Sequence, residues 1–184
     1  LNEGERAVIT IAVTPPRTPA SRAGAHHFAV VITSPNHAGR ATRLGATVTL
    51  NPFFDFAMGD LSPRQNTTGW RKPVRTAVTS IRLTNKGNAG AVYRVDGEDD
   101  QHGCSFEYQL PGQGSSRSAR QAEVHLLPET ETDLSIFVTP RKRRLVGFRK
   151  HNYSLTITSM PLSGQIIPRS VWGQLQAAPR IGPW

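Results

Sequence analysis

The densest positive charge in the chain lies in one short polar stretch near its C-terminal third. Six residues make up this basic cluster: Arg141, Lys142, Arg143, Arg144, Arg149 and Lys150. Clustered guanidinium and ammonium groups can bind phosphate, acidic glycan or lipid head groups. We therefore treat these residues as the candidate binding site for an anionic partner. The alternative is a solvated loop, because the earlier repeat of this stretch (below) carries much less charge.

A cluster of acids, Asp96, Glu98, Asp99 and Asp100, could bind calcium, which prefers several oxygen ligands at short spacing. The cluster lacks the ordered ligands and glycine of a calcium-binding loop. We therefore expect a solvated surface loop, with Asp96 capping a turn at the end of a strand.

The remaining polar residues do not form a catalytic or metal-binding pattern. His26 and His27 are adjacent in an expected strand, so their side chains point to opposite faces and cannot share one ion. Cys104 is the single cysteine, which excludes an internal disulfide and is best read as a small buried side chain. No G-x-S-x-G nucleophile turn occurs. The sequence therefore predicts no enzyme, no metal and no cofactor.

The net charge of +9 also raises nucleic acid as a partner. However, the arginines are scattered and the aromatic residues, 7% of the chain, do not interleave with them as a base-stacking surface would. We expect no specific nucleic-acid binding. The apolar runs are far shorter than the roughly 18 residues of a membrane span, and no signal peptide is visible. The chain opens at Leu1 and resembles a piece of something longer.

Short apolar runs that alternate with polar residues predict an all-β protein, because a half-buried strand has a period of two. Gly and Pro, 16 and 14 in number, separate these runs. The strands expected are 5–14, 26–34, 41–50, 76–84, 91–96, 104–110, 123–127, 131–139, 151–159 and 171–177. The turn 85–88, Asn-Lys-Gly-Asn, is expected to use the positive φ that Asn and Gly tolerate.

One pattern occurs twice. Val13-Thr14-Pro15 and the strand 26–34 recur 125 positions later as Val138-Thr139-Pro140 and 151–159. The stretch 41–50 recurs at 171–177 with a slip of about three residues. This repeat predicts tandem immunoglobulin-like β-sandwiches, the first one incomplete. We expect residues 1–52 to be the C-terminal half of one sandwich, 53–178 a complete sandwich, and 179–184 a tail or the start of a linker.

The hairpin sequence Leu83-Thr84-Asn85-Lys86-Gly87-Asn88, followed by Tyr93 and Asp96, resembles bacterial tandem Ig-like repeat domains of the NEW3 type. These modules are associated with alpha-galactosidases and with large uncharacterised bacterial membrane-associated proteins. The strand pair from Val138 to Ile157 resembles the same family. One departure is the Ser- and Arg-rich stretch that separates Pro111-Gly112 from the next strand. The resemblance implies a non-catalytic repeat module with no catalytic residues.

Two functions remain open at this point. The first is a structural spacer or protein–protein assembly surface in a larger bacterial protein, at the cell surface, secreted or membrane-associated rather than cytoplasmic. The second is a carbohydrate- or anionic-polymer-binding accessory module of an enzyme, which would use exposed Trp70 and Trp172 together with the basic cluster. The half-domain at 1–50 also predicts an apolar face and open strand edges. Upstream sequence or another chain, added as a strand or by self-association, would complete it.

Overall fold

The computed structural model describes residues 8–34, 39–69, 75–112, 118–142, 149–164 and 167–179. Every regular element in these ranges is a β-strand, as the alternating apolar pattern predicts. Consequently no helix that could cross a membrane is found in them.

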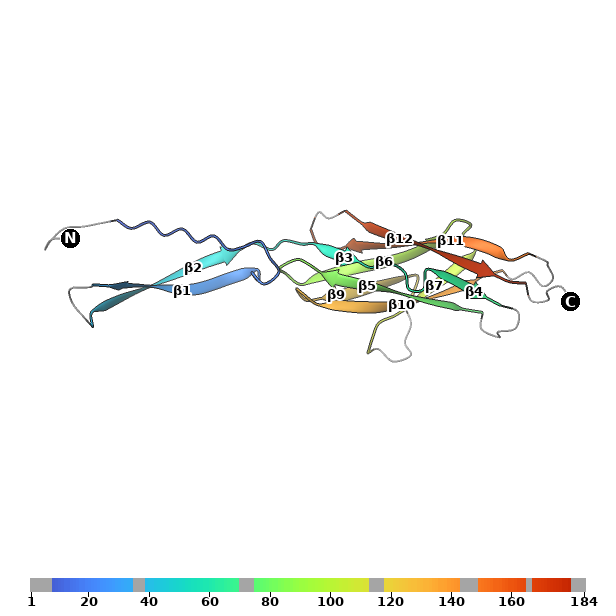
Figure 1. Cartoon of the computed structure of the whole chain (residues 1–184), viewed down its shortest axis with the longest axis horizontal. Coiled ribbons are helices and arrows are strands. Elements are labelled where there is room, and N and C mark those ends of the chain that lie inside the picture. Colours follow the sequence, from blue (N-terminus) through green and yellow to red (C-terminus); the bar gives the residue numbers. More distant parts are fainter. Residues whose placement is uncertain are drawn as a thin grey trace.

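The first two strands form a hairpin of their own. β1 (Gly24–Thr33) pairs antiparallel with β2 (Ala41–Leu50) over ten residues, and the two make a separate two-stranded sheet. Figure 1 shows this hairpin projecting from one end of the remaining strands, with the stretch that precedes β1 running beside it.

The other ten strands form two five-stranded sheets that pack face to face, which is the immunoglobulin-like sandwich predicted from the sequence (Figure 1). The first sheet has the order β3 (Phe56–Met58), β5 (Ala77–Asn85), β10 (Glu131–Pro140), β7 (Cys104–Gln109) and β8 (Ser118–Ala119). The second has the order β4 (Gln65–Thr68), β12 (Arg169–Ala177), β11 (His151–Pro161), β6 (Ala91–Asp99) and β9 (Gln121–Leu126).

The core lies between these sheets and follows the period of two in each strand. The first sheet contributes Ile81, Leu83, Leu134 and Ile136, and the second contributes Tyr93, Val95, Leu155, Ile157 and Leu175, all buried. The ring of Phe56 packs at 5.1 Å from that of Tyr93 and closes the core near β3. Cys104 is also buried and unpaired, as expected.

The pairing registers of the two hairpins can be compared at the 125-position offset found in the sequence. Phe28 on β1 faces Ala46 on β2, and Tyr153, 125 positions after Phe28, faces Leu175 on β12. Leu175 stands 129 positions after Ala46, so the copies slip by 129 − 125 = 4 residues between the two strands. The expected slip was about three. Seven residues separate the pair Thr33 and Ala41, whereas eleven separate the corresponding pair Thr158 and Ser170, so the four extra residues lie between the paired parts of β11 and β12.

The expected strand at 5–14 is wrong for its described part. Residues 8–14 pair with no other strand in the part of the chain that the structure describes. Their repeat counterpart is β10, which is held between β5 and β7. Among the described residues, the hairpin of β1 and β2 together with residues 8–23 (the hairpin unit) has no strands corresponding to β5 and β7, so residues 8–14 have the sequence of a strand but no neighbouring strands for hydrogen bonds.

Without neighbouring strands, the apolar residues of 8–14 that would face a core are exposed to solvent. Leu134, Ile136 and Val138 on β10 are exposed by 0%, 0% and 1%. Their counterparts 125 positions earlier, Ile9, Ile11 and Val13, are exposed by 73%, 54% and 48%. The first sandwich is therefore incomplete in the structure, and the chain contains a buried and an open version of the same apolar pattern.

This pair of sites gives a matched test. Ile136→Ala should lower the free energy of unfolding of the chain by about 2–5 kcal/mol, because it leaves a cavity in a filled core. Ile11→Ala should change it by less than about 1 kcal/mol, because the side chain is half in water already. Urea unfolding followed by circular dichroism measures both. Equal losses of unfolding free energy in the two variants would show that Ile11 is covered in solution.

Candidate functional site

A densely hydrogen-bonded polar site lies where the hairpin meets the sandwich. We call it the joint, and it consists of the β5–β6 turn (Asn85 to Gly90), the residues Arg17 to Ala23 before β1, and Asn51 to Phe53 after β2. Two asparagines of the turn, three positions apart, organise it.

Asn88 holds the hairpin side of the joint. Its side-chain amide donates hydrogen bonds to the carbonyl oxygens of Ser21 (2.9 Å) and Asn51 (3.2 Å). Its side-chain oxygen accepts one from the backbone N–H of Phe53 at 2.7 Å. The backbone N–H of Asn88 donates to the Phe53 carbonyl, and its own carbonyl accepts from Ala23. One buried residue thus binds the chain both before β1 and after β2.

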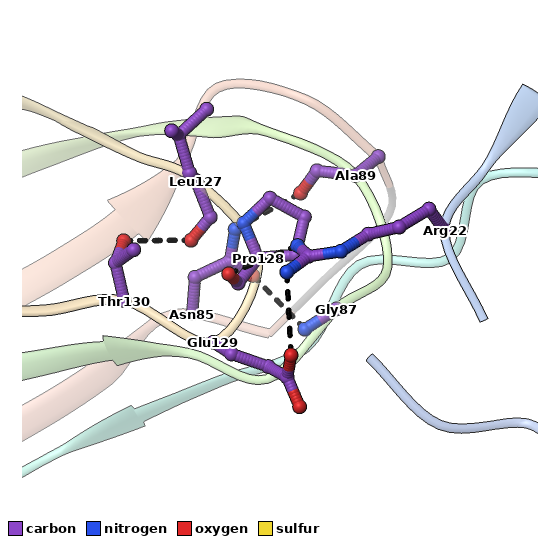
Figure 2. Close-up of polar contacts among 8 residues, drawn as sticks. All are labelled: Arg22, Asn85, Gly87, Ala89, Leu127, Pro128, Glu129 and Thr130. Carbon is purple, nitrogen blue, oxygen red and sulfur yellow. Dashed lines mark hydrogen bonds and ion pairs between the residues drawn. The ribbon is translucent and has the colours of Figure 1, made fainter. Parts of the chain in front are cut away.

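Asn85 holds the sandwich side (Figure 2). Its side-chain amide donates to the carbonyls of Ala89 (2.9 Å) and Leu126 (3.1 Å), and its side-chain oxygen accepts from the Gly87 N–H at 2.9 Å. Its backbone also exchanges hydrogen bonds with the β9–β10 turn. The residue is buried and its side-chain donors and acceptor are all satisfied, so it fixes the shape of the turn that presents Asn88.

A glycine is required at position 87 for a reason different from the one predicted. None of the turn residues Asn85, Gly87 and Asn88 has a positive φ, so that prediction was wrong. A β-carbon at Gly87 would instead lie 2.5 Å from the carbonyl oxygen of Phe53 and 3.1 Å from the Phe54 α-carbon. The glycine is required because the connecting backbone passes directly over it.

Two arginines from the loop before β1 add contacts with the sandwich. Arg22 donates to the carbonyl of Pro128 at 2.9 Å and forms an ion pair with Glu129 at 3.2 Å, as Figure 2 shows. The guanidinium of Arg17 lies 5.0 Å from the centre of the Phe53 ring, a cation–π distance. Both contacts are partly exposed and add to the hydrogen bonds of Asn88 rather than replace them.

The described part of the predicted basic cluster lies at the opposite end of the sandwich, because β10 runs from the joint to that end. Arg141, Lys142 and Arg149 line a hollow of about 420 Å³, together with His102 and His151. No ion pair joins Arg141, Lys142 or Arg149 to another described residue. We call this surface the basic end-face. Lys150 lies beside it and contacts Gln176, while Arg143 and Arg144 lie outside the described residues.

The acidic cluster differs from the prediction. Asp99 is buried, and its carboxylate accepts hydrogen bonds from the N–H groups of Gln101, Gly103 and Cys104 at 2.8–3.0 Å. The turn-capping residue is therefore Asp99, whereas Asp96 lies inside β6 opposite Thr158. The sequence did contain a signal for this role. Asp99 stands a few residues before the glycine of its own turn, the spacing at which an aspartate side chain accepts hydrogen bonds from the following backbone N–H groups. Among the described residues no three potential metal ligands gather.

The other residues singled out in the sequence have different outcomes in the structure. The adjacent histidines do act separately, since His26 contacts the Arg22 carbonyl and His27 contacts the Thr47 hydroxyl. Trp172 is 64% exposed on β12, as a binding role would need, while Trp70 lies outside the described residues. No residue triad for catalysis was predicted from the sequence, and the joint was recognised there only as a family-like hairpin.

No known protein-family model matches the chain, and no curated protein matches it. Solved structures of similar shape include the PapD-like domain 7 of human CEP192, with 13% identity over 70% of this chain and 87% of that one, and a TM-score of 0.35. The periplasmic chaperone SfaE matches with 6% identity, 70% and 59% coverage and a TM-score of 0.40. CfaE, the adhesive subunit of the CFA/I fimbria of enterotoxigenic Escherichia coli, gives 9%, 88% and 59%, and 0.41.

Burial makes a prediction for Cys104. It raises the pKa of the thiol from its usual value to about 12, and nearby Asp99 adds to the shift. The reactive thiolate is therefore nearly absent at pH 8 in the folded protein. We expect a thiol reagent such as Ellman's reagent to react at least about 100-fold more slowly with the native chain than with the chain in guanidinium. Equal rates would contradict the burial of this residue.

Proposed function

We propose that the chain is a non-catalytic structural module, a stiffly jointed pair of Ig-like units that acts as a spacer or assembly surface in a larger protein. The sequence resemblance to bacterial NEW3-type repeats supports a bacterial source, and a setting at the cell surface, in secretion or at a membrane belongs to the same proposal. The observation that carries it is the joint.

A flexible linker would leave its backbone solvated and would make few contacts with either unit. Here, Asn88 binds the segments on both sides of the hairpin through Ser21, Ala23 and Asn51, and the Arg22–Glu129 pair adds a further point of contact. Attachment at several points around the axis resists both bending and rotation. Such a joint fixes the direction in which one unit follows the other, which is what a spacer needs.

The joint gives a direct test of stiffness. Asn88→Ala removes three side-chain hydrogen bonds that together contribute about 2–4 kcal/mol, while leaving the sandwich core intact. We expect the hairpin to move more freely against the sandwich. Spin labels at Arg43→Cys on β2 and Glu98→Cys on β6 would report this as a wider distance distribution by double electron–electron resonance, because Cys104 is buried and stays unlabelled.

The matched control is Asn66→Ala, which removes a half-buried asparagine whose amide contacts the Pro63 carbonyl far from the joint. It should leave the distance distribution unchanged. Gly87→Ala should widen the distribution as Asn88→Ala does, since the added methyl group displaces the backbone of Phe53. An equally narrow distribution in all three variants would rule out the joint as the source of stiffness.

A second candidate function, the binding of an anionic polymer, is favoured by one observation. In the basic end-face, Arg149 lines the same hollow as Arg141 and Lys142, which precede it by eight and seven positions, together with two histidines. Converging guanidinium and ammonium groups can neutralise several sulfate or phosphate groups at once.

This candidate makes a prediction of its own. The triple variant Arg141→Ala, Lys142→Ala and Arg149→Ala should elute from heparin at clearly lower salt than a variant with the same loss of charge elsewhere. Arg40→Ala, Arg43→Ala and Arg64→Ala, all at exposed positions, provide that control. Elution of both variants at the same salt concentration would mean that only net charge matters, which excludes the end-face as a specific site.

A further inference from the structure

The strongest unexplained feature is the open face of the hairpin unit. The repeat identifies what covers this face in the complete sandwich. β11 is held on one side by β12 and on the other by β6, which pairs antiparallel with it from Leu155 to Pro161. β12 is held on its far side by β4, which pairs parallel with it from Gln174 to Ala177. The counterparts β1 and β2 pair only with each other among the described residues.

Side-chain burial differs between the two hairpins in the same way as strand pairing does. Tyr153, Leu155 and Ile157 on β11 are buried under the first sheet. Their counterparts are Phe28, Val30 and Ile32 on β1, which are half-buried or exposed although they are equally apolar. Leu44 on β2 pairs with Val30 and extends the same open face, and the apolar residues Ile9, Ile11 and Val13 of the preceding stretch are exposed as well. The residue types thus suit a core, while the structure leaves them without one.

We propose that this open face is a docking surface for one kind of occupant, the front half of an Ig-like sandwich built like residues 53–125 of this chain. The register follows from the repeat. One strand of the occupant runs antiparallel along Val30 to Ser34, as β6 runs along Leu155 to Ser159. A second runs parallel to residues 45–48 of β2, as β4 does on β12. Two more enclose residues 8–14, as β5 and β7 enclose β10.

A second copy of the chain does not fit this surface. Its own residues 53–125 already pair with β10, β11 and β12 of the same copy, so they are not free to bind elsewhere. The open part that a second copy can offer is another hairpin unit, which has the same half of the fold and, among the described residues, lacks counterparts of β5, β6 and β7. The occupant must bring the missing half.

The inference extends the proposed spacer function by naming what the hairpin unit binds, and it rests on that function only in treating the chain as a run of Ig-like units. The joint is tested by a distance distribution, whereas this proposal is tested by protection of the hairpin. A negative result for the stiff joint can therefore be distinguished from a negative result for the docking surface.

The test adds the missing half. A copy of residues 53–125 is fused ahead of Leu1, the position that corresponds to Leu126 in the repeat. We expect those amides of Val30 to Ser34 that point away from β2 to exchange with deuterium at least about 100-fold more slowly in the fused chain than in the 184-residue chain, because they gain a neighbouring strand to which they can donate. The amides of residues 8–14 should gain protection with them.

Two controls keep the result interpretable. Ile11→Asp in the fused chain buries a charge in the new core, so protection at Val30 to Ser34 should fall while protection along β11 stays. A second fusion with a short Gly/Ser linker at the join excludes strain at the connection. Unchanged exchange in both fusions would overturn the proposal. So would a 184-residue chain that sediments as a dimer with its hairpin amides already protected, because a second copy would then be the occupant.

Discussion

The structure depends on buried amide side chains that satisfy backbone groups in two directions. Asn85 and Asn88 are exposed by 1% and 4%, and each uses both its donors and its acceptor. Aspartate could accept but not donate here, and alanine could do neither, so several buried carbonyls would lose their partners. The spacing of three residues directs Asn85 into the sandwich and Asn88 toward the hairpin. Gly87, between them, gives the connecting backbone room to pass.

This arrangement gives the sandwich two different ends. The joint lies at one end and is rich in backbone hydrogen bonds, whereas the basic end-face lies at the other and is rich in positive charge. The loops at these two places are repeat counterparts, with Lys142 standing 125 positions after Arg17. In the first copy, Arg17 and Arg22 contact the following unit through Phe53, Pro128 and Glu129. The same loop position therefore faces a neighbouring unit in one copy and an open hollow in the other.

The sequence predicted the features that depend on local alternation. Strands such as 26–34 and 41–50 and the incomplete first unit follow from period-two patterns and their repetition. The burial of Cys104 follows from its being a lone cysteine, which behaves as a small apolar side chain. It did not predict features that depend on contacts between distant residues. Residues 8–14 have the sequence of a strand, but a strand also needs neighbours. Gly87 and Asn88 were recognised as a turn, while their role arises from segments more than 30 positions away. Asp99 was predicted to be solvated. Amino-acid composition does not reveal that three backbone N–H groups stabilise its carboxylate when it is buried.

The joint and the open face are connected by one energetic argument. A two-stranded hairpin is at best marginally stable in water, because half of its hydrogen-bonding groups and one apolar face stay solvated. The joint stabilises only the base of β1 and β2, through Ala23 and Asn51. Toward the far end of the hairpin, Ile32 and Leu44 on this face are exposed, and each apolar side chain of this size loses roughly 1.5–3 kcal/mol by remaining in water instead of a core. The joint therefore sets the direction of a surface whose own stability depends on being covered.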